Sequence, residues 1–140
     1  MISRSQCLAV FASVLFVFQS ASAQEWTRFH GPNGQGVSSL KSFPAEWSDE
    51  NIAFKAELPG IGHSSPVLWG EKVFLLSADP ETAERYVLCL DANSGKILWQ
   101  HDYKSTTHKL HLRSSYASCT PVVDEEMVIF AWSDPQHTLV

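Results

Sequence analysis

The sequence has few basic residues and few cysteines, and each shortage excludes a class of function. Ten Lys and Arg stand against 15 Asp and Glu in 140 residues, which gives a formal charge of −5. No cluster of basic residues interrupts this acidic balance, so binding to nucleic acid or to an anionic membrane surface is not expected. The three cysteines are never adjacent, so the chain contains no vicinal disulfide.

Long hydrophobic runs are also missing, apart from one near the amino terminus. Residues 1–23, MISRSQCLAVFASVLFVFQSASA, contain Arg4, an apolar stretch from Leu8 to Phe18, and small residues at positions 21–23. This order is typical of a secretory signal peptide with an A-x-A cleavage site. The apolar stretch is shorter than the roughly 20 residues of a membrane-spanning helix. We expect export with cleavage, hence a periplasmic or secreted protein without an integral membrane span; an uncleaved anchor is the alternative.

Removal of this leader changes the charge and the cysteine count. Arg4 and Cys7 leave with it, so nine basic residues remain against 15 acidic ones, a formal charge of −6. Cys89 and Cys119 are then the remaining cysteines. In an exported protein the two can form a disulfide, while buried free thiols are the alternative. The sequence does not decide whether the two cysteines pair, and it does not determine the oligomeric state.

Motifs for phosphate binding, nucleophilic catalysis and metal binding are absent or incomplete. The stretch GPNGQG (31–36) lacks the GK[ST] ending of a phosphate loop and is expected to form turns. No G-x-S-x-G motif occurs. His101, His108 and His111 fit no established ligand spacing and are expected in a solvated loop. We therefore predict no catalytic residue and no metal site in this chain.

An internal repeat is the strongest positive signal. SPVLWGEKVFLLSADP starts at Ser65 and TPVVDEEMVIFAWSDP starts at Thr120, 55 positions later, with six identities in sixteen positions. Both contain short apolar segments bounded by turn residues, a pattern typical of strands in a repeat array. Recurring Asp-Pro pairs at Asp79 and Asp134 are expected to be turns, not catalytic groups.

The first repeat predicts four antiparallel strands, and the second predicts an incomplete copy of them. The expected strands of the first are SSPVLW, KVFLLSA, RYVLCLDA and KILWQHDY; those of the second are CTPVV, MVIFAWS and HTLV. We expect an all-β chain of about one and a half β-propeller blades. The predicted boundaries are a leader (1–23), a lead-in segment (24–61), a first blade (62–103), an inter-blade loop (104–114) and a truncated second blade (115–140).

The stretch LCLDANSGKILWQ carries a family resemblance. It resembles the repeat of pyrroloquinoline-quinone-type β-propellers, A-x-D-x-x-T-G-x-x-x-W, with Asp91, Gly95 and Trp99 at the matching positions, and Cys89 and Ser94 in place of Ala and Thr. The resemblance implies that these residues dock one blade onto the next. Glycine permits a left-handed turn, Asp caps donors in that turn, and Trp supplies a wide apolar face.

The rest of the chain after the leader resembles the amino-terminal part of exported propeller-repeat proteins of planctomycete-type bacteria. The residues that carry this are WTRFHGPNGQGVS, GHSSPVLWGEKVFL and SSYASCTPVVDEEMV. The resemblance implies an amino-terminal fragment of an exported propeller, but no single activity. We expect the chain to act as a non-catalytic binding or scaffold module, with a protein or peptide as its partner. The alternative is a fragment of a quinoprotein dehydrogenase. We expect no cofactor in this chain, and a site for pyrroloquinoline quinone and calcium would require a longer parent protein.

Overall fold

The computed structural model describes residues 25–40 and 44–140, and the predicted leader lies outside the described residues. A single turn of 3-10 helix, η1 (Asp49–Asn51), precedes the strands. The strands are β1 (Val67–Trp69), β2 (Lys72–Ala78), β3 (Arg85–Asp91), β4 (Ile97–Tyr103), β5 (Val122–Val123), β6 (Val128–Ile129), β7 (Trp132–Ser133) and β8 (Thr138–Leu139). Within the described part of the chain, no helix has the length and apolar character needed to cross a membrane.

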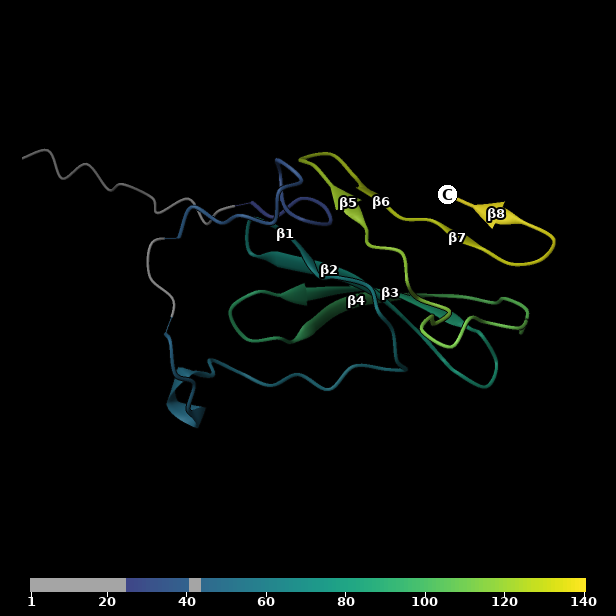
Figure 1. Ribbon diagram of the computed structural model, residues 1–140, viewed down its shortest axis with the longest axis horizontal. Coiled ribbons are helices and arrows are strands. Elements are labelled where there is room, and N and C mark those ends of the chain that lie inside the picture. Colours follow the sequence, from purple (N-terminus) through teal and green to yellow (C-terminus); the bar gives the residue numbers. More distant parts are fainter. Residues whose placement is uncertain (1–24, 41–43) are drawn as a thin grey trace, which may run out of the picture.

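Strands β1 to β4 form one antiparallel sheet in sequential order (Figure 1). The chain reverses between β1 and β2 at Gly70, whose φ of +56° suits glycine, and between β3 and β4 at Gly95. The expected strand KVFLLSA coincides with β2, and the other three expected strands agree with β1, β3 and β4 apart from residues at their ends. The predicted all-β class and the four-stranded antiparallel unit are confirmed.

One face of this sheet is apolar from strand to strand. Phe74 on β2 lies opposite Cys89 on β3, and Cys89 lies opposite Trp99 on β4. Leu76 and Val87 form the next row of the same face. Side chains at every second position of a strand share a face, so the sequence pattern of β2 and β3 aligns these rows. The rows belong to two buried clusters that also contain residues of the second repeat.

The second repeat forms two short hairpins, β5–β6 and β7–β8, instead of one continuous sheet. Figure 1 shows them one after the other beside the four-stranded sheet. The expected single strand MVIFAWS is wrong: it is divided into β6 and β7, and Phe130 and Ala131 lie between them. The strand is divided because its two halves have different partners. β6 pairs with β5, which precedes it in the sequence, whereas β7 pairs with β8, which follows it. No closed barrel forms among the described residues, which is consistent with an incomplete propeller.

Hydrogen bonds join the two repeats at the segments that precede β1 and β5. The backbone N–H groups of His63 and Ser64 donate to the carbonyl of Ala117, at 3.0 and 2.9 Å. The backbone N–H of Ser65 donates to the hydroxyl of Thr120 at 3.1 Å. These bonds hold the connection between β4 and β5 against the segment that leads into β1.

The start of the lead-in segment contacts both repeats. Trp26 pairs with Leu68 of β1 through two backbone hydrogen bonds, and the carbonyl of Thr27 accepts one from Val123 of β5. The lead-in therefore contributes an extended piece of backbone to the joint between the repeats.

Cys89 and Cys119 are free thiols. Cys89 is fully buried on β3, and Cys119 is half-buried in the segment before β5. Burial raises the pKa of the Cys89 thiol, and nearby Lys72 opposes the shift. Of the two possibilities that the sequence left open, the structure has the unpaired one.

Candidate functional site

The predicted docking residues form a capped turn between β3 and β4. The Asp91 carboxylate accepts hydrogen bonds from the backbone N–H groups of Asn93 and Ser94, at 3.1 and 2.8 Å, and from the Ser94 hydroxyl at 2.7 Å. Gly95 has a φ of +71°, and its N–H donates to the Asp91 carbonyl at 2.8 Å. The turn therefore needs an acceptor at position 91 and a residue without a side chain at position 95.

Gly95 also lies close to the lead-in segment. A Cβ atom at this position would stand 2.5 Å from the Phe54 ring and 3.0 Å from the Cβ atom of Ala56. Gly95 is thus a contact between the β3–β4 turn and the lead-in, a partner that the sequence did not indicate.

Trp99 lies between the first sheet and the second repeat. Its ring is 5.9 Å from the Phe74 ring and 5.1 Å from the His101 ring, and it packs against the cluster that contains Val123. It also packs against the second cluster, which contains Ala117. Contact with both clusters is what a docking side chain requires, and the docking role of Asp91, Gly95 and Trp99 stays a prediction.

The same aspartate cap occurs three more times. At each of these positions one carboxylate oxygen accepts two backbone N–H bonds from the residues two and three positions further along. These hydrogen bonds hold the pKa of each carboxyl below its usual value, as they do at Asp91. The three residues are Asp79, Asp124 and Asp134. The expectation that Asp79 and Asp134 are turn residues is confirmed.

The three histidines of the predicted loop have separate surroundings. The expectation of a solvated loop is wrong for His101, which is part of β4 and contacts the Trp99 ring. The His108 ring contacts the Tyr116 ring edge-on at 5.2 Å. His111 accepts a hydrogen bond from the backbone N–H of Arg113 through Nδ1 at 3.1 Å. Among the described residues, no group of three His, Cys, Asp or Glu side chains is arranged to hold a metal ion.

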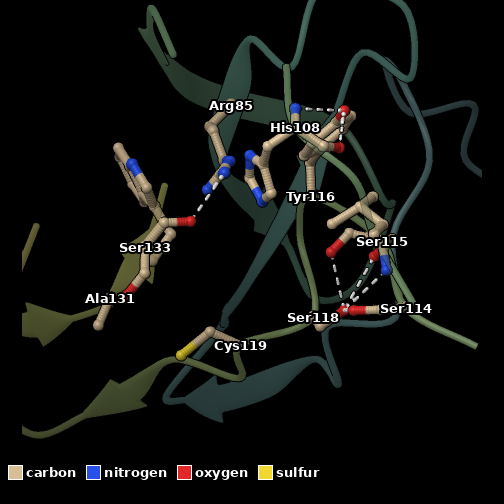
Figure 2. A pocket seen from close by; sticks show the side chains of 11 residues that line it. Arg85, His108, Ser114, Ser115, Tyr116, Ser118, Cys119, Ala131 and Ser133 are labelled. Atoms are coloured by element: carbon tan, nitrogen blue, oxygen red, sulfur yellow. Dashed lines mark hydrogen bonds between the residues drawn. The ribbon is translucent and has the colours of Figure 1, made fainter. Parts of the chain in front are cut away.

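A cavity of about 400 Å³ lies where the first sheet meets the second repeat. Its lining comes from the start of β3, from the β4–β5 connection and from the β6–β7 region. Figure 2 shows Arg85 extending from β3 between Ser133 on one side and His108 on the other, with three serines opposite. Sequence analysis did not indicate this cavity, and none of the predicted docking residues lines it.

Arg85 is the main polar feature of the cavity wall. Its side chain is almost fully buried, with the residue 2% exposed. The Nε and Nη1 atoms have no hydrogen-bond partner among the described residues, and Nη2 donates a long hydrogen bond of 3.5 Å to the Ser133 carbonyl. Nε and Nη1 together carry three of the five N–H protons of a guanidinium. A buried cation with most of its donors unused is costly, because each unpartnered donor has lost its water.

Two aromatic rings hold the guanidinium in place. The Cζ atom of Arg85 lies 5.3 Å from the centre of the Trp132 ring and 5.8 Å from that of the Tyr116 ring. Trp132 is itself held by Tyr103 and Phe130, at ring distances of 5.0 and 5.5 Å. Ring faces attract a guanidinium but accept no conventional hydrogen bonds from it. The rings therefore hold the guanidinium in place and leave its Nε and Nη1 protons without an acceptor.

The charge of Arg85 is only partly balanced by the protein. Burial lowers the pKa of the guanidinium, while Asp134 and Tyr116 act in the opposite direction. Asp134 reaches Arg85 only through its field, since no ion pair within 4.0 Å joins these two residues and the Asp134 carboxylate is used in its own turn. Arg85 remains protonated, because the pKa of arginine is too high for burial of this kind to neutralise it.

Serine hydroxyls form the opposite wall. The Ser118 hydroxyl lies 3.2 Å from the hydroxyls of both Ser114 and Ser115, and it donates to the Ser115 carbonyl at 3.0 Å. The Tyr116 hydroxyl is used locally, donating to the His108 carbonyl at 3.0 Å. The backbone N–H groups of His63 and Ala117 donate to the Ser115 hydroxyl, and that of Ser115 donates to the Ser118 hydroxyl, so these two hydroxyls are largely used within the protein. The cavity thus has one charged wall and one neutral polar wall.

A signal for the site is present in the sequence. In RYVLCLD the positions of Arg85, Val87 and Cys89 alternate, so the three side chains share one face of β3. Register places Arg85 opposite Ala78 of β2 and Tyr103 of β4, at the end of the apolar face. An arginine in phase with buried positions is therefore the pattern that predicts a buried cation here.

Comparisons with protein-family models, with curated proteins and with solved structures give no match.

Proposed function

We propose that the chain is a non-catalytic binding module, built from propeller-type blades and exported to the periplasm or the medium. The observation that carries the proposal is the buried Arg85 guanidinium, which lines an open cavity with Nε and Nη1 unpartnered. A donor buried without an acceptor destabilises the fold, and a ligand that supplies the acceptor removes that cost. Polar groups that break the rules of core packing are characteristic of functional sites.

A peptide segment is the favoured occupant. The cavity lies at the junction of two repeats, and its walls offer a cation, neutral hydroxyls and aromatic rings to the same ligand. Aromatic residues and arginine are the side chains that contribute most at protein-binding surfaces. The volume of about 400 Å³ lies in the range of sites for small ligands and single side chains.

A peptide array tests this function. The full chain is applied to immobilised random octapeptides, together with the Arg85→Met variant and the Arg113→Met variant as a matched control. Arg113 is exposed and does not line the cavity. We expect a subset of peptides to bind the parent chain and the Arg113 variant but not the Arg85 variant. No bound peptide, or binding indifferent to Arg85, would contradict the proposal.

The quinoprotein alternative stays a prediction with its own test. A cofactor that binds the folded state raises the midpoint of unfolding, by an amount that grows with its concentration. Urea unfolding of the full chain is therefore measured with and without pyrroloquinoline quinone and calcium. An unchanged midpoint is expected for a binding module, and a raised one would favour the dehydrogenase alternative.

A further inference from the structure

We propose that the Arg85 cavity binds a carboxylate group, with the guanidinium as its cationic partner; this rests on the proposed function and names its ligand class. The shape of the guanidinium favours a carboxylate. A guanidinium presents its N–H groups as a planar fork that matches the two oxygens of a carboxylate. Here Nε and Nη1 are the unpartnered members of that fork, and the side chain that carries them is buried.

The single cation in the cavity favours a ligand with one negative charge. Arg85 is the one Lys or Arg side chain among the residues that line the cavity. Asp134 lies close enough for its negative charge to act on the guanidinium. A phosphate carries up to two charges at neutral pH and would meet one cation and the field of Asp134. A carboxylate carries one charge, which the single guanidinium balances.

The remaining lining of the cavity favours an organic ligand. Leu110, Ala131 and Trp132 give one part of it an apolar surface, and the Ser114 and Ser115 side chains give another part hydroxyls. Apolar lining with a few fixed polar groups is the usual composition of an organic ligand site. A free inorganic anion makes no favourable contact with the apolar part of the cavity. A carboxylate attached to an apolar group can bury that group there. The expected ligand is therefore an organic carboxylate, either a chain terminus or an acidic side chain.

Small matched probes test the ligand class. N-acetyl-phenylalanine is compared with its uncharged amide, with the α-amide of N-acetyl-glutamic acid, and with inorganic phosphate, each titrated into the full chain and followed by ligand-observed NMR. We expect at least one of the two carboxylates to bind about tenfold or more tightly than the uncharged amide and phosphate, because hydrogen bonds to charged groups are strong. Tighter binding of N-acetyl-phenylalanine identifies a chain terminus as the source, and tighter binding of the glutamic acid derivative identifies a side chain.

Variants link the binding to Arg85. The Arg85→Met variant is expected to lose at least about tenfold in carboxylate affinity, Arg85→Lys to retain part of it, and Arg113→Met to retain all of it. If Arg85→Met does not fold, the comparison of the acid with its amide on the parent chain still tests whether the ligand is a carboxylate. Equal binding of acid and amide, or tighter binding of phosphate, would overturn the carboxylate assignment. If Arg85-dependent peptides are nevertheless found on the array, the binding function stands and the ligand class alone has failed.

Discussion

The sheet β1–β4 and the hairpins β5–β8 contain the same sixteen-residue pattern, yet they fold differently. In the first repeat the pattern gives β2, a strand of seven residues that pairs on both sides with β1 and β3. In the second it gives β6 and β7, of two residues each, with partners on opposite sides of a break. Phe74 and Ile129 occupy equivalent positions, and their exposed fractions are 5% and 46%. Strand length here depends on the available partners as well as on the residues themselves.

The largest expected effect compares those two equivalent positions. Phe74→Ala removes a ring from the cluster between the sheet and the second repeat and should lower the free energy of unfolding by about 3–5 kcal/mol. Ile129→Ala should cost less than about 1 kcal/mol, because nearly half of that side chain already faces water. Urea unfolding of both variants checks the difference. Equal losses would mean that the second repeat is as well packed as the first.

The second prediction concerns the contact of the first sheet with the lead-in. Gly95→Ala places a methyl group on the Phe54 ring at a position with positive φ, and should cost about 2–4 kcal/mol. Gly70→Ala is the matched control, since Gly70 also has positive φ but nothing lies within 4 Å of an added Cβ; it should cost about 1–2 kcal/mol. Similar midpoints of thermal unfolding would show that the Phe54 contact contributes nothing.

The third prediction tests whether Trp99 joins the two regions. Trp99→Ala should lower the free energy of unfolding by about 2–3 kcal/mol, below the range for a fully buried tryptophan. Because Trp99 packs against both clusters, amide hydrogen exchange should accelerate at Val123 and Val128 and change less in the middle of β2. Uniform acceleration over both repeats would show that they unfold as one unit.

The smallest effect is a pH dependence that arises in the aspartate turns. The pKa of Asp91 is lowered in the folded chain, so its contribution to stability is complete well above the usual value of 3.8 and is lost as the pH falls through the folded-state pKa. Asp91→Asn keeps an oxygen acceptor but removes this titration. Unfolding midpoints measured from pH 7 down to about pH 2 should therefore fall less steeply for the variant. An equally steep fall of the midpoint in the parent chain and in the variant would contradict a stabilising role of the ionised Asp91 carboxylate.

The first repeat was predictable from the sequence because its signals are local. Turn residues bound each of its strands, and alternation of apolar residues sets the faces of β2 and β3. The division of MVIFAWS was not predictable, since the break at Phe130 and Ala131 follows from the positions of β5 and β8. Arg85 was missed because a charged residue at the start of a strand is usually solvent-exposed, and only its phase with Val87 indicates otherwise.

The hydrogen bond from Ser65 to Thr120 has a geometric consequence for the repeat. The two residues are 55 positions apart, which is the period of the repeat, so each is the counterpart of the other in its own unit. The Ser65 nitrogen and the Thr120 Oγ1 atom are 3.1 Å apart, so the two equivalent positions are in direct contact. A substitution at either position therefore acts on both units at once.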